Sequence, residues 1–360
     1  MTNVAVLCNI ASSRVVWGMV RIAKRVGVVL FQLGGPDSRA AVEPFLFNLF
    51  CDPDIIDFPF SRLGRRPLAR LIASTRAKKV AQHYRVLGGY SPIRQLTERQ
   101  AAALETRLIR DGVDARCVVA MRYWHPFTVE AIAQLEKAHV DRVVLLPLYP
   151  QYSSTTTGSS LNEWRRSWHD AVPTSCVTTF YRHQLYIAVV VDRIREALAG
   201  FPDQAAVQLV FSAHGIPTSV VEKGDPYQRQ IEETVALVME EGAWSNPHCL
   251  CYQSKVGASR WLRPSLHETL RKMAMEKVRE VCVIPISFVS DHVETLAEID
   301  HCARAEARQL GIERFAMTQG LNDSPRFIEA LAALVVAAIS EPVLEDQDRE
   351  EAGALSMATD

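Results

Sequence analysis

The stretch Val281-Cys-Val-Ile-Pro-Ile-Ser-Phe-Val289, with Ser290-Asp-His-Val-Glu-Thr-Leu-Ala-Glu-Ile-Asp300 directly after it, decides the predicted fold. The first part is short, apolar and rich in β-branched residues, which predicts a buried strand. The second part begins with Ser290 and Asp291 and has Glu294 in capping-box position, which predicts the start of a helix. In open α/β sheets, ligands bind where the carboxyl end of a strand opens into a helix, so this junction is a candidate site.

Carboxylates recur along the predicted helix. Asp291, Glu294 and Glu298 lie three and seven residues apart. At about 100° per residue they fall within roughly 60° of one another, on one face. Like charges on one face repel unless protons or a cation lie among them, and His292 adds an imidazole at the same turn. The alternative is a solvated acidic face with Asp291 as a helix cap, but the position at a strand end favours a site.

The composition is that of a soluble globular protein, with 48% hydrophobic and 22% charged residues among 360. The formal net charge of -1 gives no overall attraction to nucleic acid, so we expect no such partner. The eight cysteines are scattered without a CxxC pair, which favours a reduced, cytoplasmic protein. No apolar run has the length of a membrane span. Residues 1–25 are basic and favour an N-terminal extension; if they are a transit segment, an organelle replaces the cytoplasm.

Strand-like runs followed by helix-like patterns recur along the whole chain. The strand-like runs are 26–33, 116–121, 143–149, 175–179, 206–212, 249–253 and 281–289. Repeated β-turn-α units predict parallel sheets. The predicted fold class is α/β, with two Rossmann-like (doubly wound, parallel-sheet) domains and a cleft between them. The predicted parts are an extension 1–25, an N-terminal domain 26–180, a C-terminal domain 181–322, a helix 323–340 and a disordered acidic tail 341–360.

The segment 58–72 alternates arginines with apolar residues and continues toward Arg76. One interpretation is an amphipathic surface helix that buries its apolar side. The other is a lip over a pocket for a flat, apolar, anionic ligand, with peripheral contact to a membrane surface. The turn Gly34-Gly-Pro36 after the first strand is not a GxGxxG motif, so the dinucleotide fingerprint is absent and no nucleotide is expected.

His214 follows the end of the strand 206–212, at the same predicted sheet edge as the carboxylates after Val289. A lone buried histidine is usually a hydrogen-bonded core residue. Imidazole beside carboxylates, however, suits Fe(II), Zn(II) or Co(II), and also suits proton transfer near neutral pH. Nearby motifs supply Tyr123, Trp261 and Phe288, which fit a large planar aromatic ligand. From the residues alone, metallation of a tetrapyrrole is one interpretation among several.

Several strings occur together here in the order found in ferrochelatases. They are Leu33-Gly-Gly-Pro36, Gly88-Gly-Tyr-Ser-Pro92, Met121-Arg-Tyr-Trp-His-Pro126, Tyr149-Pro-Gln-Tyr152, Thr156-Thr-Gly-Ser-Ser-Leu161, Ser212-Ala-His-Gly-Ile-Pro217, Gln253-Ser-Lys-Val-Gly257 and Phe288-Val-Ser-Asp-His-Val-Glu-Thr-Leu296. The chain therefore resembles the ferrochelatase family over residues 26–339. The resemblance implies insertion of Fe(II) into a porphyrin (protoporphyrin IX to protohaem) with release of two protons, as the terminal step of haem synthesis. It also implies two Rossmann-like domains that hold the macrocycle in their cleft.

The resemblance assigns roles residue by residue. It implies that His214 and Glu294 are the catalytic pair and the residues that handle the metal, and it leaves open which of the two takes the protons. Asp291, His292 and Glu298 would form the supporting network. The porphyrin-binding positions implied by the motifs are Leu33, Arg76, Ser91, Tyr123, Trp261 and Phe288.

The chain departs from many family members at the position of an iron–sulfur cluster. Those members bind a [2Fe-2S] cluster through four cysteines, three of them in a C-terminal tail. The tail 341–360 has no cysteine here, and Ser154 stands at the fourth position, so no cluster is expected.

Alternative functions are a chelatase for Co(II) or coproporphyrin, a non-catalytic porphyrin carrier and a nucleotide-dependent Rossmann enzyme. The opposed carboxylates argue against the carrier, and the missing glycine fingerprint argues against the nucleotide enzyme.

Overall fold

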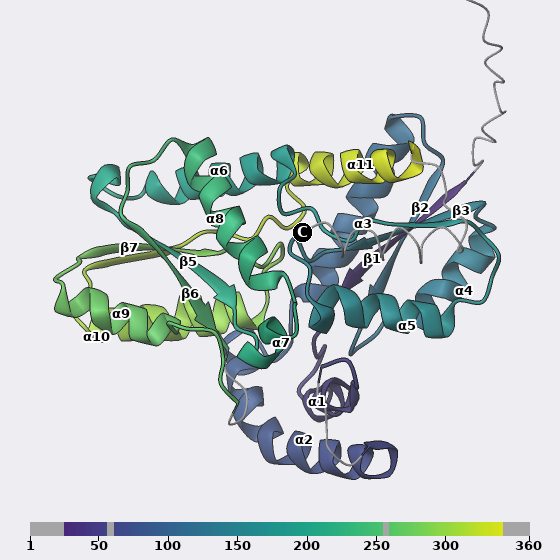
Figure 1. Ribbon diagram of the computed structural model, residues 1–360, viewed down its shortest axis with the longest axis horizontal. Coiled ribbons are helices and arrows are strands. Elements are labelled where there is room, and N and C mark those ends of the chain that lie inside the picture. Colours follow the sequence, from purple (N-terminus) through teal and green to yellow (C-terminus); the bar gives the residue numbers. More distant parts are fainter. Residues whose placement is uncertain (1–24, 56–60, 255–258, 341–360) are drawn as a thin grey trace, which may run out of the picture.

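The computed structural model describes residues 25–55, 61–254 and 259–340, and it contains two four-stranded parallel sheets (Figure 1). The N-terminal sheet has the order β2-β1-β3-β4 and the C-terminal sheet the order β6-β5-β7-β8. The strands are β1 (Val26–Gln32), β2 (Ala115–Met121), β3 (Arg142–Pro147), β4 (Thr174–Cys176), β5 (Gln208–His214), β6 (His248–Gln253), β7 (Glu280–Pro285) and β8 (Arg314–Met317). The predicted α/β class with two parallel sheets is confirmed, and β8 is a strand that the sequence pattern missed.

Helices cover both faces of each sheet, as right-handed crossovers between parallel strands require (Figure 1). The α-helices are α1 (Val42–Cys51), α2 (Ser61–Val86), α3 (Ile93–Arg110), α4 (Thr128–Ala138), α5 (Ser159–Ser167), α6 (Gln184–Leu198), α7 (Thr218–Glu222), α8 (Tyr227–Gly242), α9 (Leu266–Met275), α10 (Arg304–Gln309) and α11 (Pro325–Ser340). Two π-helices, η1 (Ser154–Gly158) and η3 (Val293–Ala303), and a 3₁₀-helix, η2 (Gln204–Ala206), complete the described elements. The polar segment after β3 contains η1 and the start of α5.

The central strands are mostly apolar because both of their faces are covered. Every residue of β1 is buried. Gly27 allows α4 to approach this strand, since a Cβ atom at that position would lie 2.7 Å from Leu135 Cδ2. This close packing explains why the first strand reads as a continuous apolar run instead of an alternating one.

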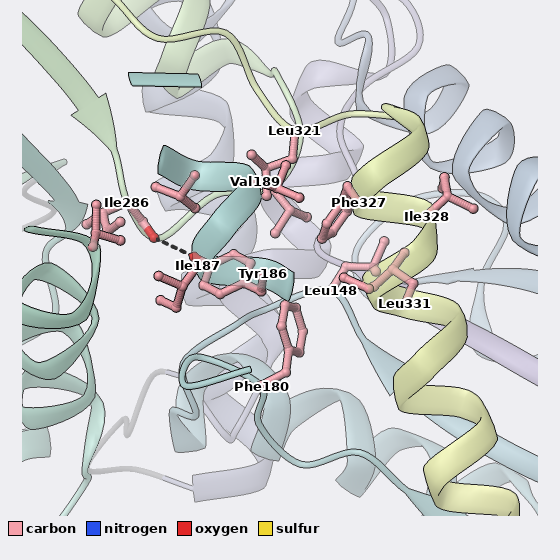
Figure 2. Close-up of a cluster of buried hydrophobic side chains, with 14 of the residues drawn as sticks. Leu148, Phe180, Tyr186, Ile187, Val189, Ile286, Leu321, Phe327, Ile328 and Leu331 are labelled. Atoms are coloured by element: carbon pink, nitrogen blue, oxygen red, sulfur yellow. Dashed lines mark hydrogen bonds between the residues drawn. The ribbon is translucent and has the colours of Figure 1, made fainter. Parts of the chain in front are cut away.

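One hydrophobic core runs through both sheets (Figure 2). It contains Leu30 of β1 and Phe211 of β5, and it includes Phe327 of α11. In Figure 2, α11 presents Phe327, Ile328 and Leu331 to this core, and the hydroxyl of Tyr186 on α6 donates to the carbonyl of Ile286 at 3.3 Å. Because apolar side chains are shared between the halves, their relative position is fixed by packing. The boundaries 26–180, 181–322 and 323–340 stay predictions.

The helices α1 and α2 project from the sheets (Figure 1), and we call these two helices the lip. They have a separate apolar cluster that contains Phe45, Phe50, Ala73 and Tyr84, and Val293 at the start of η3 packs against it. Residues 61–72 of the predicted amphipathic segment 58–72 lie in α2, a helix of 26 residues. Residues 58–60 of that segment, the extension 1–24 and the tail 341–360 lie outside the described residues.

Candidate active site

The candidate site lies where β5 and β7 end side by side. These strands pair in parallel with Ser212 opposite Pro285, so the residues that follow them emerge at the same sheet edge. His214 is the last residue of β5, and Glu294 lies in the first turn of η3 after β7. The imidazole Nδ1 of His214 is 2.8 Å from Oε2 of Glu294. The structure therefore brings together the two residues that the sequence placed at the strand ends.

The histidine–glutamate pair lies at the edge of solvent-accessible space. The side chain of His214 keeps 34% of its surface exposed, and that of Glu294 keeps 16%. Burial lowers the pKa of His214, but the Glu294 and Glu298 carboxylates together raise it by more, so the net pKa lies above its usual value. Burial raises the pKa of Glu294, but His214, His292 and the Ser254 hydroxyl together lower it by more, so the net pKa is lowered. Opposed shifts of this kind in one accessible pair are typical of functional sites.

A serine hydroxyl connects this pair to a second carboxylate. The Oγ atom of Ser254 is 3.0 Å from Oε2 of Glu294 and 2.9 Å from Oε2 of Glu298. On the other side, Nδ1 of His83 on α2 is 3.6 Å from Oε1 of Glu298, and this carboxylate raises the pKa of His83. Sequence reasoning missed Ser254 and His83. Ser254 stands in one of the family strings, but His83 has no local signal because its partner lies 215 residues away in the chain.

The expected stripe of three carboxylates on one α-helix is wrong in two respects. The helix begins at Val293, after Asp291, and it is a π-helix with i→i+5 hydrogen bonds instead of an α-helix. The N–H of His292, the residue before this helix, donates to Oγ1 of Thr295 at 3.1 Å. The sequence pattern assumed about 100° per residue, which does not hold in this helix. Glu294 and Glu298 nevertheless lie together, because both contact the Ser254 hydroxyl.

Asp291 and His292 lie at the start of η3 but have partners of their own. The Asp291 carboxylate accepts from Asn322 Nδ2 at 2.8 Å and from the Gly320 N–H at 3.2 Å. His292 is buried, and its Nδ1 lies 3.0 Å from the carbonyl of Ser290. These contacts hold the loop that precedes Glu294. A direct role of Asp291 and His292 in the network around His214 stays a prediction.

The aromatic ring of Phe288 lies between the two histidines. Its centroid is 6.3 Å from that of His214 and 4.5 Å from that of His292, with both pairs edge to face. On the other side of the β5 loop, Trp261 forms a bridge with Pro217 and lines a cavity of about 710 Å³. The same cavity is lined by Ser254 and Glu298, the residues that extend the polar network. Phe288 and Trp261 thus both lie near the site, and their contact with a porphyrin stays a prediction.

The other predicted porphyrin-binding residues lie on the N-terminal half, and they differ in exposure. Leu33 packs against the lip cluster, and the Arg76 guanidinium lies 5.8 Å from the Phe50 ring centroid. Ser91 is buried against the first turn, where a Cβ atom on Gly35 would come within 2.7 Å of it.

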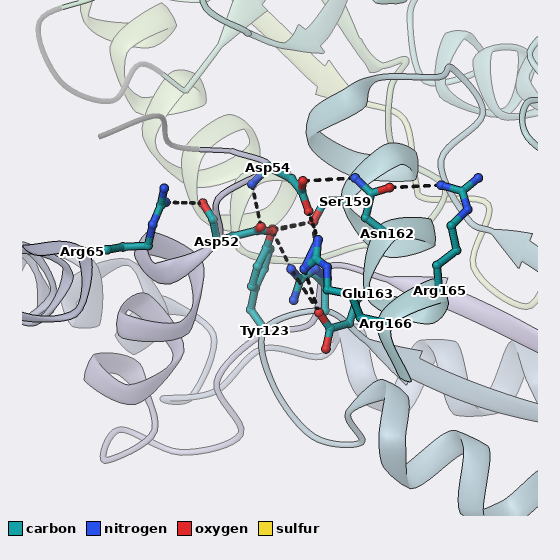
Figure 3. A network of polar contacts seen from close by, with 10 residues as sticks. Asp52, Asp54, Arg65, Tyr123, Ser159, Asn162, Glu163, Arg165 and Arg166 are labelled. Carbon is teal, nitrogen blue, oxygen red and sulfur yellow. Dashed lines mark hydrogen bonds and ion pairs between the residues drawn. The ribbon is translucent and has the colours of Figure 1, made fainter. Parts of the chain in front are cut away.

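Tyr123 is only 1% exposed. Its hydroxyl donates to Oδ2 of Asp52 at 2.5 Å (Figure 3). In this conformation Tyr123 supports the lip from beneath and offers almost no surface to a ligand. Its contact with a porphyrin stays a prediction.

Two further observations concern metals and membranes. Within residues 25–55, 61–254 and 259–340, no three or more His, Cys, Asp or Glu side chains are grouped so as to hold a metal ion. The pair His214–Glu294 brings together two side chains of these types. Across the same described ranges, no helix combines the length and apolarity of a membrane span. Ser154 stands where cluster-binding family members are expected to have their fourth cysteine, and its hydroxyl donates to Asp225.

Comparison with known proteins agrees with this geometry. The family model described as Ferrochelatase matches residues 25–339. A ferrochelatase of Geotalea daltonii is 48% identical over 318 residues, covering 87% of this chain and 98% of that relative. A ferrochelatase of Picosynechococcus sp. is 47% identical over 325 residues, covering 88% of this chain and 83% of the relative.

Solved structures show likeness in fold alone. SirB from Bacillus subtilis with Fe3+ matches with a TM-score of 0.51 at 12% identity, over 88% of this chain and 96% of that one. DR2241 from Deinococcus radiodurans, described as structurally similar to chelatases, matches with a TM-score of 0.51 at 15% identity, over 92% of this chain and 59% of that one. The match of the family model over almost all of the described chain, together with relatives that are nearly half identical, shows that this chain belongs to the ferrochelatase family.

Proposed function

We propose that the protein inserts Fe(II) into a porphyrin, with His214 and Glu294 as the groups that act on the ring nitrogens and the metal. The observation that carries this proposal is the 2.8 Å contact between His214 Nδ1 and Glu294 Oε2, in a pair that remains partly accessible. Membership of the ferrochelatase family supports the reaction. Protoporphyrin IX and Fe(II) are the proposed substrates, with no nucleotide and no resident cluster, and the cytoplasm is the proposed location.

The chemistry requires a proton acceptor and a metal donor at one place. A free porphyrin carries two pyrrole N–H groups, and both protons must leave before a divalent metal can occupy the centre. When Nδ1–H of His214 donates to the Glu294 carboxylate, the lone pair of Nε2 remains free to accept a proton. The carboxylate stabilises the imidazolium that forms, which agrees with the raised pKa of His214. We therefore assign proton acceptance to His214, oriented by Glu294. Because the His214 side chain is 34% exposed, the imidazolium can release the first pyrrole proton to solvent and then accept the second in the same way. The Glu294 carboxylate, and the neutral imidazole of His214 after it has released its proton, are able to contact the incoming Fe(II).

The test is anaerobic metallation of protoporphyrin IX by the purified chain with Fe(II), followed by absorbance. We expect turnover by the parent chain, and a loss of at least about 100-fold in kcat for His214→Ala and for Glu294→Gln, in the range that general acid–base catalysis supplies. Glu130→Gln is the matched control, because Glu130 forms the same Nδ1–Oε2 contact with His125 at 2.7 Å, on the surface. Tight porphyrin binding without metallation, unchanged in both site variants, would favour a porphyrin carrier instead.

We also propose that the lip touches a membrane surface peripherally. Leu71 and Leu68 on α2 are 61% and 39% exposed, and Arg70 and Arg66 lie on the same helix. Exposed leucines beside arginines suit the headgroup region of an anionic bilayer. Co-sedimentation with vesicles tests this. The parent chain should bind phosphatidylserine vesicles but not neutral vesicles, and Leu71→Asp should not bind either. Equal sedimentation of the parent chain with neutral and anionic vesicles would contradict the electrostatic part of the proposal.

A further inference from the structure

The backbone of His214 is held by two side chains on either side of the residue. Its N–H donates to Oγ of Ser287 at 2.9 Å, and its carbonyl oxygen accepts from the hydroxyl of Tyr227 at 2.9 Å. Tyr227 is 5% exposed, and burial raises the pKa of its hydroxyl, so this group keeps its proton and remains a donor. His214 is the last residue of β5, so these contacts fix the point where regular strand pairing stops.

Tyr227 is itself fixed by an aspartate that reaches the other half of the molecule. The N–H of Tyr227 donates to Oδ1 of Asp225 at 3.0 Å. The second oxygen of Asp225 accepts from the Ser154 N–H and the Ser154 hydroxyl, both at 2.7 Å, and from the Ser153 hydroxyl at 3.1 Å. Ser153 and Ser154 follow β3 of the N-terminal sheet. Asp225 precedes α8 and Tyr227 begins it, and α8 connects β5 to β6 of the C-terminal sheet along the chain. One carboxylate thus joins the two halves.

Two neighbouring contacts fasten the same loop to the same helix. The N–H of Tyr152 donates to Oε1 of Gln230 at 2.7 Å, and Nε2 of Gln151 donates to the Thr234 hydroxyl at 3.0 Å. Gln151, Gln230 and Thr234 are buried, so these hydrogen bonds are shielded from water. The loop 151–154 therefore determines where the first turns of α8 lie, and with them Tyr227.

We propose that Tyr227 is a positioning residue for His214, and that Asp225 couples its position to the loop 151–154 of the N-terminal half. This inference rests on the proposed function of His214. The contact between His214 and Glu294 tolerates displacements of only about 0.5 Å before its geometry is lost. A tyrosine hydroxyl on the carbonyl of His214 restrains the backbone on this scale. The docking of one half against the other thereby sets the angle at which the imidazole meets Glu294.

The first experiment measures kcat and KM for porphyrin in Tyr227→Phe, Asp225→Asn and Ser154→Ala. We expect kcat to fall about tenfold in Tyr227→Phe and by a smaller factor in the other two, with KM within about twofold of the parent, because the imidazole is displaced while the porphyrin surface is unchanged. Tyr181→Phe is the matched control. Tyr181 is also buried, and its hydroxyl also contacts α8, where it donates to Glu233 at 2.6 Å. This hydroxyl is not the donor to the His214 carbonyl, which is Tyr227.

Equal kcat values in Tyr227→Phe and the parent would overturn the inference, as would an equal loss in Tyr181→Phe. The second experiment does not depend on activity. The ¹⁵N resonances of the His214 imidazole, identified by their loss in His214→Ala, should shift in Tyr227→Phe and Ser154→Ala and stay in place in Tyr181→Phe. Unshifted resonances would refute the positioning role. If the His214 resonances shift in these two variants as expected but the parent chain does not metallate porphyrin, the proposed function alone would be refuted.

Discussion

Replacing Asp52 with asparagine should destabilise the protein strongly, because this carboxylate is a buried charge with three side-chain donors. Its side chain has 0% exposure. It accepts from the Tyr123 and Ser159 hydroxyls, both at 2.5 Å, and it pairs with Nη2 of Arg122 at 3.0 Å (Figure 3). These contacts join the end of α1 to the segment after β2 and to the start of α5. Asp52→Asn keeps the shape of the side chain but removes its charge and replaces one acceptor oxygen by a donor.

The magnitude follows from the burial of both partners. Arg122 is only 12% exposed, so removal of its partner leaves a charge with little access to water. Breaking a buried pair by changing one member costs about 3–5 kcal/mol. Glu163 lies 3.7 Å from the same guanidinium and compensates in part, so we expect the lower end, about 3 kcal/mol. With an m-value of roughly 3 kcal/mol/M in urea, the midpoint of unfolding should fall by roughly 1 M.

The assay is urea unfolding followed by tryptophan fluorescence, with Asp54→Asn as the matched control. Asp54 lies two residues away and also pairs with an arginine, Arg166, but that arginine is 44% exposed. Exposed pairs contribute less than about 1 kcal/mol, so the control should unfold close to the parent. If the two variants lose equal stability, the reasoning from buried charge is wrong.

Two further perturbations test the shared core and the contact between the lip and η3. Phe327→Ala should cost about 3–5 kcal/mol because the ring is fully buried between the halves, and Val336→Ala on the exposed side of α11 should cost less than about 0.5 kcal/mol; equal urea midpoints would contradict a shared core. Glu298→Gln should lower the raised pKa of His83 toward 6.5, measured by proton NMR titration. Since the pKa of His83 is raised in the folded protein, its ion pair with Glu298 stabilises the fold at low pH, and this stabilisation is lost as the pH rises through the raised pKa. An unchanged pKa of His83 in Glu298→Gln would show that Glu298 does not cause the shift.

The central strands and the proximity of His214 to Glu294 could be predicted because their signals are local. Apolar runs that end in turn residues mark β1, β5 and β7, and chemistry-bearing residues directly after them are expected at one sheet edge. His214 and Glu294 follow this rule. In contrast, β8 has four residues, all at least partly exposed, and lies at the edge of its sheet, so its sequence Arg314–Met317 shows neither a long apolar run nor a clear alternation.

The arrangement around Glu294 could not be predicted because it depends on contacts distant in sequence. The carboxylate of Asp291 is drawn away from the predicted stripe by Asn322, whose backbone has a positive φ of 46° and presents its amide to the loop. Ser254 and His83 reach the network from β6 and α2, and neither spacing nor propensity links them to η3. The stripe was correct for Glu294 and Glu298, although the helix that carries them differs from the one on which the argument relied.

Two of the apolar clusters, the main core and the lip cluster, indicate which part of the molecule would move if a large flat ligand entered. The main core contains side chains from both sheets and from α11, so moving one sheet away from the other would expose residues such as Phe211 and Phe327. The lip has its own cluster, which contains Phe45 and Tyr84 and is separate from that core. We therefore expect α1 and α2 to adjust on ligand entry while the sheets keep their relative position. The Asp52 network then acts as the polar anchor of the lip, because Tyr123, which donates to Asp52, belongs to the lip cluster itself.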